Sequence, residues 1–109
     1  MDPNYTTWCN IINQLHSLDT RARQAADGDF YHRRIERIHD LLKDIQLLVH
    51  DPLGETYSST RTDCEAILEG EATESMTIVE VIKPIVYYTQ GETRRLIQPG
   101  VVLVKGKAL

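Results

Sequence analysis

The feature that most constrains the fold of this chain is a series of short β-type segments in its last third, residues 77–104. Residues 78–82, 85–88 and 101–104 are rich in β-branched and aromatic side chains, which suit a pleated, half-buried surface. Turn signals separate these segments at Gln90-Gly91 and at Pro99-Gly100. Between the two turns, residues 95–97 are predicted to form one more short strand. The sequence therefore predicts a small all-β unit.

Two helices are predicted ahead of this unit. The first begins just before Trp8 and carries an apolar stripe made of Trp8, Ile11, Ile12, Leu15 and Leu18. Gly28 suits the left-handed conformation that ends a helix. The second helix carries a heptad-like seam made of Tyr31, Ile35, Ile38, Leu42, Ile45 and Val49. It is predicted to end at Asp51, because the residue before a proline avoids helical dihedral angles.

The broad apolar stripe on the second helix needs a partner beyond the first helix. Either the β region packs against it, or two chains pair their hairpins into a four-helix bundle. We favour the second arrangement, a homodimer, because the seam is heptad-like and runs the length of the helix. The predicted dimer interface consists of Trp8, Ile11, Leu15, Ile35, Ile38, Leu42 and Ile45.

The segment between the helices and the β-unit is polar and has no sustained period. Residues 53–63 are predicted to form an ordered loop, residues 64–68 the first short strand, and residues 69–75 an exposed acidic connection. The predicted fold class is α+β, with an N-terminal helical hairpin that forms a dimeric four-helix bundle and a small C-terminal all-β domain. The two domains are predicted to cover residues 1–51 and 52–109.

Composition and charge argue against several functional classes. The chain has 109 residues, enough for one small domain, and its formal net charge of −4 disfavours binding to nucleic acid. No apolar run approaches the roughly 18 residues of a membrane span, so we expect no membrane association. The polar N-terminus lacks the charged-then-apolar pattern of a signal peptide, and we therefore expect a cytoplasmic protein.

The residue types that most often carry catalysis or bind metals do not form a recognised motif. Cys9 and Cys64 are far apart and lack a C-x-x-C spacing, so both are expected to be buried free thiols. His32 and His39 would lie about two turns apart on the second helix, too far for one metal ion. We expect no metal, no cofactor and no enzymatic activity. A small thiol- or metal-dependent enzyme that uses Cys64 is the less favoured alternative.

Three segments of the chain, taken in order, form a recognisable pattern. Residues 15–19, followed by a Gly-Asp loop and a leucine-rich helix, form the first. Residues 53–57 with residues 64–67 form the second, and Val79-Glu80-Val81-Ile82 with residues 95–104 form the third. The last two segments resemble the G-E-x-F-D-P, H-E-A-V, V-V-E-V and closing motifs of the GrpE family, and the first resembles its helical region. GrpE proteins are the nucleotide exchange factors of DnaK-type heat-shock chaperones.

The resemblance implies a function in protein folding and the heat-shock response. Members of the family are dimers whose helices form a four-helix bundle and whose β-domain binds the nucleotide-binding domain of the chaperone. The β-domain opens the nucleotide cleft and releases ADP. The expected function is therefore that of a GrpE-like co-chaperone and exchange factor. The alternative is a GrpE-like adaptor that binds a chaperone or another partner without exchange activity.

The same resemblance implies three partner-binding residues. Arg95 matches a β-domain arginine that contacts the chaperone, while Ile82 and Val104 match apolar contact positions. The chain also departs from the family pattern. Gln98 stands where a second arginine is usual, and Gly100 replaces an alanine. The family's long N-terminal coiled-coil helix has no counterpart here, so we do not expect the contacts attributed to that helix.

Overall fold

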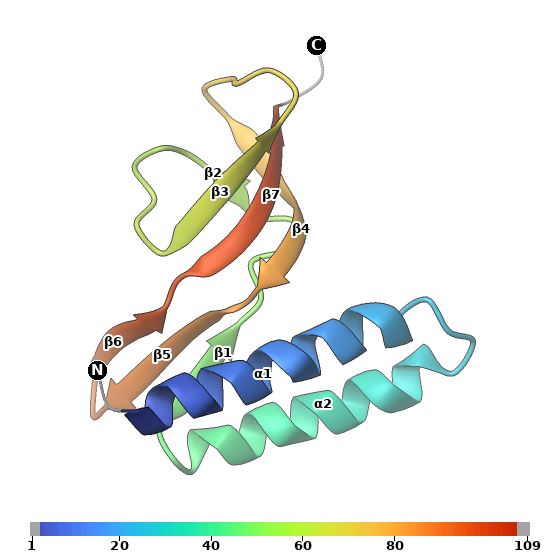
Figure 1. Ribbon diagram of the computed structural model, residues 1–109, viewed down its shortest axis with the longest axis vertical. Coiled ribbons are helices and arrows are strands. Elements are labelled where there is room, and N and C mark those ends of the chain that lie inside the picture. The colour runs from blue at the N-terminus through green and yellow to red at the C-terminus, as the bar shows by residue number, and fades with distance from the viewer. Residues whose placement is uncertain (1–2, 107–109) are drawn as a thin grey trace.

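A computed structural model describes residues 3–106, and its central element is one long antiparallel β-ribbon (Figure 1). The ribbon consists of β4 (Met76–Lys83), β5 (Ile85–Gln90), β6 (Thr93–Gln98) and β7 (Gly100–Gly106). β4 pairs with β7, β5 pairs with β6, and the chain reverses at Gly91, whose φ is 62°. Pro84 and Pro99 interrupt the two arms, because proline cannot donate a hydrogen bond to a ladder. The ribbon passes from one sheet to another at these prolines.

Each half of the ribbon is extended by further strands into a sheet. β2 (Thr56–Tyr57) and β3 (Cys64–Glu69) flank β4 and β7, and give a four-stranded sheet with the order β2-β4-β7-β3. In this sheet β3 runs parallel to β7. β1 (Leu47–His50) pairs with β5 and gives a three-stranded sheet with the order β1-β5-β6. The core of the four-stranded sheet consists of Cys64, Ile78, Val81, Ile85, Val102 and Val104.

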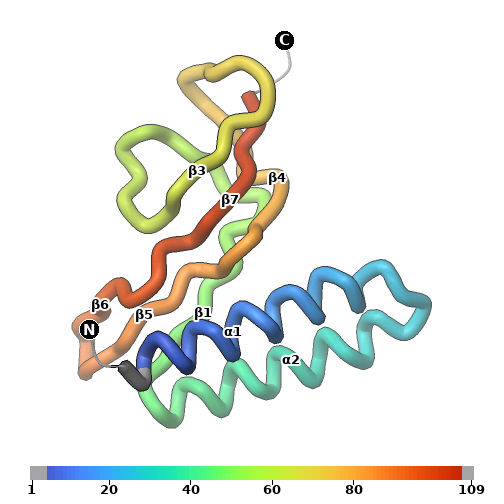
Figure 2. Tube along the Cα trace, viewed as in Figure 1, coloured from blue at the N-terminus to red at the C-terminus, as the bar shows by residue number. Residues whose placement is uncertain are grey.

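The helices α1 (Pro3–Ala22) and α2 (Gly28–Lys43) form a hairpin that packs on the three-stranded sheet. The second core of the protein lies between these layers and consists of Cys9, Ile12, Leu42, Leu47 and Val86. Figure 2 shows the hairpin across one end of the ribbon, with the four-stranded sheet projecting away from it. The described residues therefore have an L-shaped outline, with the helices along one arm and the four-stranded sheet along the other.

The strands of the last third form where the sequence pattern predicts them. Within the described residues, the β-type segments and the strand predicted at residues 95–97 all lie in β4 to β7. The strand predicted at residues 64–68 is also confirmed as β3, although two other strands precede it. The turn predicted at Gln90-Gly91 joins β5 to β6, whereas Pro99-Gly100 forms no turn, because the chain continues along the same arm of the ribbon from β6 into β7.

The second helix is shorter than its heptad-like seam predicts. α2 ends at Lys43, and Gln46 turns the chain with a φ of 65°. The residues that follow form β1 and pair with β5 instead of continuing the helix. A short run such as Leu47-Leu48-Val49 fits a helix or a strand equally well by its spacing. Pairing with a distant strand decided its conformation.

The first helix buries only part of the predicted stripe. From Tyr5 onward, the buried residues of α1 are Cys9, Ile12, His16 and Asp19, so Ile12 of the stripe is buried, whereas Trp8, Ile11 and Leu18 are exposed. His16 and Asp19 accept burial because both find hydrogen-bonding partners, which satisfy their polar atoms. Apolar periodicity alone cannot reveal such a face.

The predicted fold class is wrong, because the structure does not support the dimeric four-helix bundle. The described residues form seven strands in two sheets with two helices, so the fold is mostly β. The hairpin shares a core with the three-stranded sheet rather than standing apart as a helical stalk. The physical reason is β1, which follows α2 directly and pairs with β5 about 40 residues later.

Candidate partner-binding surface

The alternation of side chains along β7 defines two faces of the four-stranded sheet. Val102 and Val104 point into the core with exposed fractions of 0% and 1%, so Val101 and Leu103 lie on the opposite side. Their neighbours on adjacent strands share that side. We call the set the outer face, and it consists of Glu65, Ile67, Glu69, Thr77, Glu80, Lys83, Val101, Leu103 and Lys105.

Two irregularities in β4 add apolar side chains beside the outer face. The register of β4 against β7 shifts between Ile78 and Glu80, and again between Val81 and Lys83. Each shift leaves one extra residue on β4, as in a β-bulge. The extra residues are Val79 and Ile82, and their exposed fractions are 43% and 44%. Their backbone geometry therefore turns both side chains to the surface.

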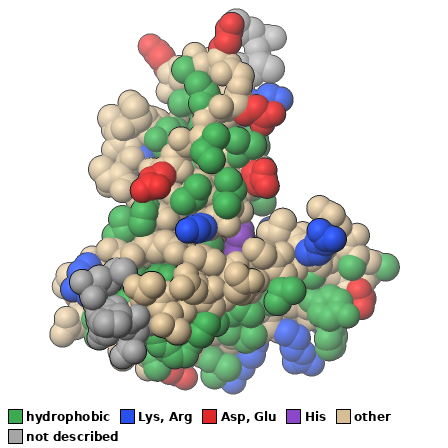
Figure 3. All heavy atoms as spheres, in the orientation of Figure 1, with side chains coloured by type: hydrophobic (Ala, Val, Ile, Leu, Met, Phe, Trp, Pro, Cys, Tyr) green, Lys and Arg blue, Asp and Glu red, His purple; other side chains and the backbone are tan. Residues whose placement is uncertain are grey.

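The composition of this surface suits a protein partner. Ile67 and Leu103 are direct cross-strand neighbours and form an apolar row with Val101. The charged residues of the outer face border this row. Glu65 and Lys83 lie beside Val101, Glu80 lies beside Leu103, and Glu69 and Lys105 lie beyond Ile67 and Leu103. Figure 3 shows hydrophobic side chains gathered over the four-stranded sheet with acidic and basic ones at their borders. Apolar patches with a polar rim mark many protein-binding sites.

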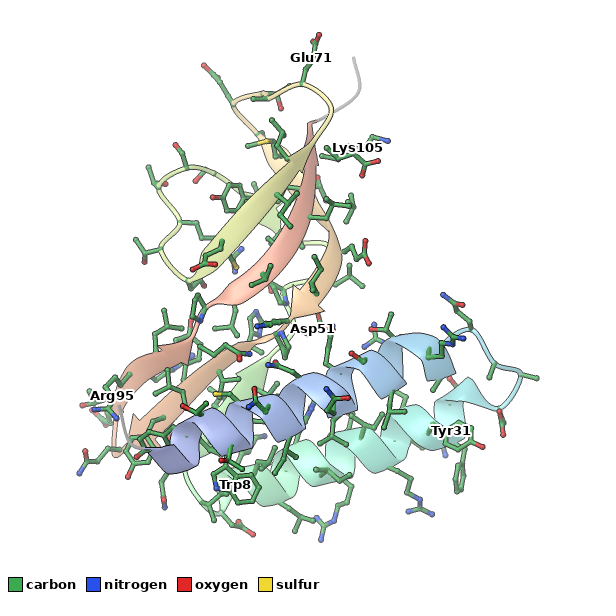
Figure 4. The ribbon with its side chains drawn as sticks, viewed as in Figure 1. Trp8, Tyr31, Asp51, Glu71, Arg95 and Lys105 are labelled. Carbon is green, nitrogen blue, oxygen red and sulfur yellow. The ribbon has the colours of Figure 1, made fainter. Side chains whose placement is uncertain are left out.

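The three sequence-predicted partner residues do not lie together. Ile82 is exposed on β4, beside the outer face. Val104 is 1% exposed and belongs to the core, so its side chain is not available at the surface. On β7 the surface positions are those of Val101 and Leu103. Arg95 is exposed on β6, in the other sheet, near the end of the ribbon that lies opposite Lys105 (Figure 4).

Arg95 belongs to an aromatic cluster at the end of the ribbon. Its guanidinium carbon lies 5.7 Å from the ring centre of Tyr5 and 5.8 Å from that of Tyr88. The two rings are 5.3 Å apart. Arg94 stacks on Tyr87 on the other face of the sheet at 5.6 Å. These cation–π contacts hold both guanidinium groups over tyrosine rings at an exposed position.

Gln98 joins α1 to the point where the ribbon changes sheet. Its Nε2 donates to Asn13 Oδ1 at 2.8 Å and to the Pro84 carbonyl at 2.9 Å. In return, Asn13 Nδ2 donates to Gln98 Oε1 at 3.0 Å. The side chain that stands in place of the family's arginine is therefore bound internally.

Close packing explains why position 100 holds a glycine. A Cβ atom at this position would lie 2.9 Å from Ile85 Cγ1 and 3.3 Å from Cys64 Sγ. Carbon atoms in proteins do not approach each other that closely, so an alanine would require Ile85 or the strand to move. The glycine lets β7 begin directly against the core.

The predicted dimer interface is divided between exposed and buried positions. Ile35 and Leu42 are buried within the chain, and Leu15 and Ile38 are half-buried. Trp8, Ile11 and Ile45 are exposed. With Leu18, Tyr31 and Leu41 they form what we call the hairpin outer face, and Figure 4 shows Trp8 and Tyr31 pointing away from the sheets. An open apolar hollow of about 400 Å³ between Leu18 and Tyr31 continues this face.

A charged network that sequence reasoning missed holds the loop before β3. Arg61 donates through Nε to Asp63 and through Nη2 to Glu55 Oε1 at 2.8 Å. His50 Nε2 lies 2.6 Å from Glu55 Oε2. The hydrogen bond from Arg61 lowers the pKa of Asp63, and Asp63 raises the pKa of Arg61. Burial alone would raise the pKa of Glu55, but its bonds to Arg61 and His50 lower it.

A second polar cluster lies between α1 and its neighbours. His16 Nε2 lies 2.7 Å from the Val81 carbonyl, which can only accept, so this nitrogen carries the proton. The buried Asp19 carboxylate accepts from Arg23 Nη2 and pairs with His32 Nδ1, both at 2.9 Å. Burial lowers the pKa of the nearby His39. The sequence offered no signal for the contacts of His16 with Val81 and of Asp19 with His32, because these partners lie on other elements.

The two thiols are buried and free, as predicted. Burial raises the pKa of Cys64 to about 11, and the neighbouring Asp63 adds to this rise. Burial also raises the pKa of Cys9. Thiolates are the reactive form, so both groups are poor nucleophiles in the folded chain. Residues 3–106 bring together no group of three or more His, Cys, Asp or Glu side chains that could hold a metal ion.

Neither described helix is long and apolar enough to cross a lipid bilayer. Comparisons with protein-family models, with curated proteins and with solved structures found no match to this chain.

Proposed function

We propose that this chain is a GrpE-like co-chaperone that binds the nucleotide-binding domain of a DnaK-type chaperone and promotes release of ADP. The observation that carries the proposal is the exposed outer face on a sheet that projects from the helices. Most of the segments that resemble the family lie in this sheet: residues 79–82 on β4, residues 64–67 on β3 and residues 101–104 on β7.

The architecture supports insertion into a cleft. β4 and β7 are strands of the continuous ribbon, which the helical hairpin supports at its other end. The four-stranded sheet projects from the hairpin, so its outer face is accessible to the lobes of a partner. The bulged Ile82 and the apolar row of Ile67, Val101 and Leu103 are the proposed contacts of this surface.

The proposed mechanism requires no catalytic side chain. A factor that binds the open state of the chaperone more tightly than the closed state shifts the population toward the open state. A difference of about 4 kcal/mol in binding free energy changes the population ratio roughly a thousandfold. By linkage, bound nucleotide weakens the binding of the factor by the same free energy. The proposal places the chain with its chaperone in the cytoplasm.

Arg95 provides a second proposed contact, away from the outer face. Its guanidinium is exposed and is oriented by Tyr5 and Tyr88, and an arginine held against aromatic rings is a frequent anchor in protein interfaces. Ile82 and Arg95 lie on different sheets, so a partner that engages both must contact the ribbon along much of its length.

We also propose that the chain forms a homodimer through the hairpin outer face. This face carries several large apolar side chains with exposed fractions between 37% for Trp8 and 62% for Leu18. Apolar surface of this kind gains free energy when a partner removes it from water. A second copy is the proposed partner, because a two-fold dimer would place the same apolar face of each chain against the other and remove both from water.

One observation favours the alternative of an adaptor without exchange activity. Gln98 replaces an arginine of the family pattern, and its amide is bound to Asn13 and Pro84. The closing motif therefore presents one charge fewer to a chaperone, which removes a contact that could distinguish the open from the closed cleft.

Release of fluorescently labelled ADP from a DnaK-type chaperone, followed by stopped flow, tests both readings. Acceleration by the chain supports the exchange factor. Saturable binding to the nucleotide-binding domain without acceleration supports the adaptor. The absence of both overturns the assignment to this class. The Phe30→Asp variant, altered on the helical hairpin, is a matched control that retains the outer face.

A further inference from the structure

The edge of the four-stranded sheet formed by β3 is open. Within the described strands, β3 has only β7 as a neighbour, and its pairing with β7 is regular over all six residues. Among residues 3–106, no backbone hydrogen bond outside the strand ladders involves a residue of β3. Its second edge therefore presents a row of unpaired backbone donors and acceptors, which is the geometry that accepts a further strand.

The other outer strands have protection that β3 lacks. β2 contains only two residues, and β1 contains four and is followed by Asp51 and Pro52. β6 carries Arg94 and Arg95, and its pairing with β5 is irregular. Short length, basic side chains, proline and irregular pairing all discourage strand addition. β3 has none of these features, so it is the edge most open to a partner.

Apart from Cys64, which belongs to the core, the residues of β3 are exposed on both sides of the sheet. Leu68 pairs with the buried Val104 and points to the same side, yet Leu68 is 45% exposed. Ile67 lies on the outer face and is 49% exposed. An added strand would cover both apolar side chains, which contributes hydrophobic free energy beyond the backbone hydrogen bonds.

The acidic residues around β3 determine which charges a partner strand should carry. Glu65 and Glu69 flank Ile67 on the outer face, and Glu71 and Glu74 follow in the next loop. In the part of the chain that the structure describes, none of these carboxylates forms an ion pair. Opposite charges that face each other across strands are favourable, and like charges are unfavourable. A partner strand should therefore carry basic residues opposite Glu65 and Glu69.

The same charges disfavour a second copy of β3 as the partner. An antiparallel pair centred on Ile67 would place Glu65 of each copy opposite Glu69 of the other. Two such like-charge contacts oppose the pairing. The complementary pattern is basic, apolar, apolar, apolar, basic, because alternate residues of the added strand face Glu65, Ile67 and Glu69 on one side and Ala66 and Leu68 on the other.

From these observations we infer that the β3 edge binds an extended peptide segment of another protein by strand addition, and that the segment has this basic–apolar–apolar–apolar–basic pattern. The pattern reads the same in both directions, so it fits parallel and antiparallel addition alike. This site does not require the proposed chaperone function, because it depends on the open backbone edge of β3, although it shares Glu65, Ile67 and Glu69 with the outer face.

The test is a titration of the isotope-labelled 109-residue chain with the peptide acetyl-GKVIVKG-amide, followed by amide NMR shifts. We expect saturable shifts confined to residues 64–69 and their neighbours, with a Kd below about 1 mM. The matched peptide acetyl-GEVIVEG-amide should bind about tenfold more weakly. The basic peptide methylated at its three central nitrogens should not bind measurably, because on either edge at least one central donor is replaced by a methyl group that would project toward β3.

Other outcomes overturn the inference. Equal affinity for the basic and acidic peptides, retained binding of the methylated peptide, shifts elsewhere on the chain, or no saturation would each contradict it. Shifts at β3 that appear when the chain is concentrated without peptide would identify a second copy as the occupant, against the proposal. In the double variant Glu65→Lys, Glu69→Lys, whose substitutions lie on the surface, the preference should change to the acidic peptide. No chaperone is present in this assay, so its result is independent of the exchange measurement.

Discussion

Asn13 on α1 and Gln98 at the end of β6 pair both of their side-chain amides, at 3.0 and 2.8 Å. Gln98 Nε2 also donates to the carbonyl of Pro84. The residues are far apart in the sequence, and their contact fixes the hairpin to the point where the ribbon passes between the two sheets. Gln98 therefore has a structural role at a position where the family pattern has a charge.

The Gln98→Ala variant should lower the free energy of unfolding by about 1–3 kcal/mol, because it leaves the Asn13 amide and the Pro84 carbonyl without their partner. Asn13→Ala should lower it similarly. Their effects should not add, since both remove the same pair. Urea unfolding followed by circular dichroism measures the difference. The Gln14→Ala variant, at an exposed position on α1, serves as the control. Strictly additive effects would show that the two amides do not interact.

The Arg61 network predicts a dependence of stability on pH. Arg61 holds the pKa of Asp63 below its ordinary value, and the pKa of Glu55 is also lowered. Their contribution to stability is therefore present above the ordinary carboxyl pKa values, 3.8 and 4.5, and is lost as pH falls through the lower folded values. Arg61→Gln should cost about 1–2 kcal/mol near pH 7 and progressively less in acid.

Unfolding free energies of the original chain and the Arg61→Gln variant, measured between neutral and acid pH, check this expectation. Arg33→Gln removes a charge of the same kind from an exposed position on α2 and should show no such convergence. If the difference in unfolding free energy between the original chain and Arg61→Gln stays constant down to low pH, Arg61 does not stabilise the fold through the two carboxylates.

The buried thiols should react slowly in the folded chain. With its pKa raised to about 11, Cys64 is almost entirely protonated at pH 8. We expect alkylation on the order of a hundredfold slower than in the chain unfolded in guanidinium chloride. Mass spectrometry of iodoacetamide-treated protein, resolved for Cys9 and Cys64, measures both rates. Rapid modification of Cys64 in the folded chain would contradict this account and favour the thiol-dependent enzyme.

The strands of the last third could be predicted because local and global preferences agree there. β-branched residues occupy the strands, and Gly91, Pro84 and Pro99 interrupt them where the ribbon turns or changes sheet. β1 could not be predicted in the same way. Leu47 to Val49 continue the spacing of the preceding helix, and only pairing with β5, far along the chain, selects the strand.

The candidate surface was less predictable than the sheet that carries it. Ile82 is exposed because the register of β4 against β7 shifts beside it, and no residue type in the sequence predicts this shift. Residues 101–104 are all apolar, so their pattern does not tell which of them face the core, and Val104 proved to be buried. The buried face of α1 depends on partners of His16 and Asp19 that lie on other elements. Such contacts belong to the tertiary structure and leave no periodic signal.

The hairpin outer face predicts self-association. Light scattering over a concentration series should show a dimer, and Leu18→Glu should shift the equilibrium toward the monomer, because it places a charge in an apolar contact. Val79→Glu, at an exposed position beside the outer face of the four-stranded sheet, should leave the dimer unchanged. A chain that stays monomeric into the high-micromolar range would refute the homodimer.

The central claim is that a DnaK-type chaperone binds the outer face together with the adjoining Ile82. Release of labelled ADP in the presence of the Ile82→Asp variant tests this claim most directly. Ile82 is exposed at a bulge, so the substitution should leave the thermal melt almost unchanged. The original chain and the Phe30→Asp control should accelerate release, and Ile82→Asp should lose about tenfold or more of that acceleration, the effect of removing one apolar anchor. Equal acceleration by Ile82→Asp would exclude this surface, and no acceleration or binding by the original chain would contradict the proposed function.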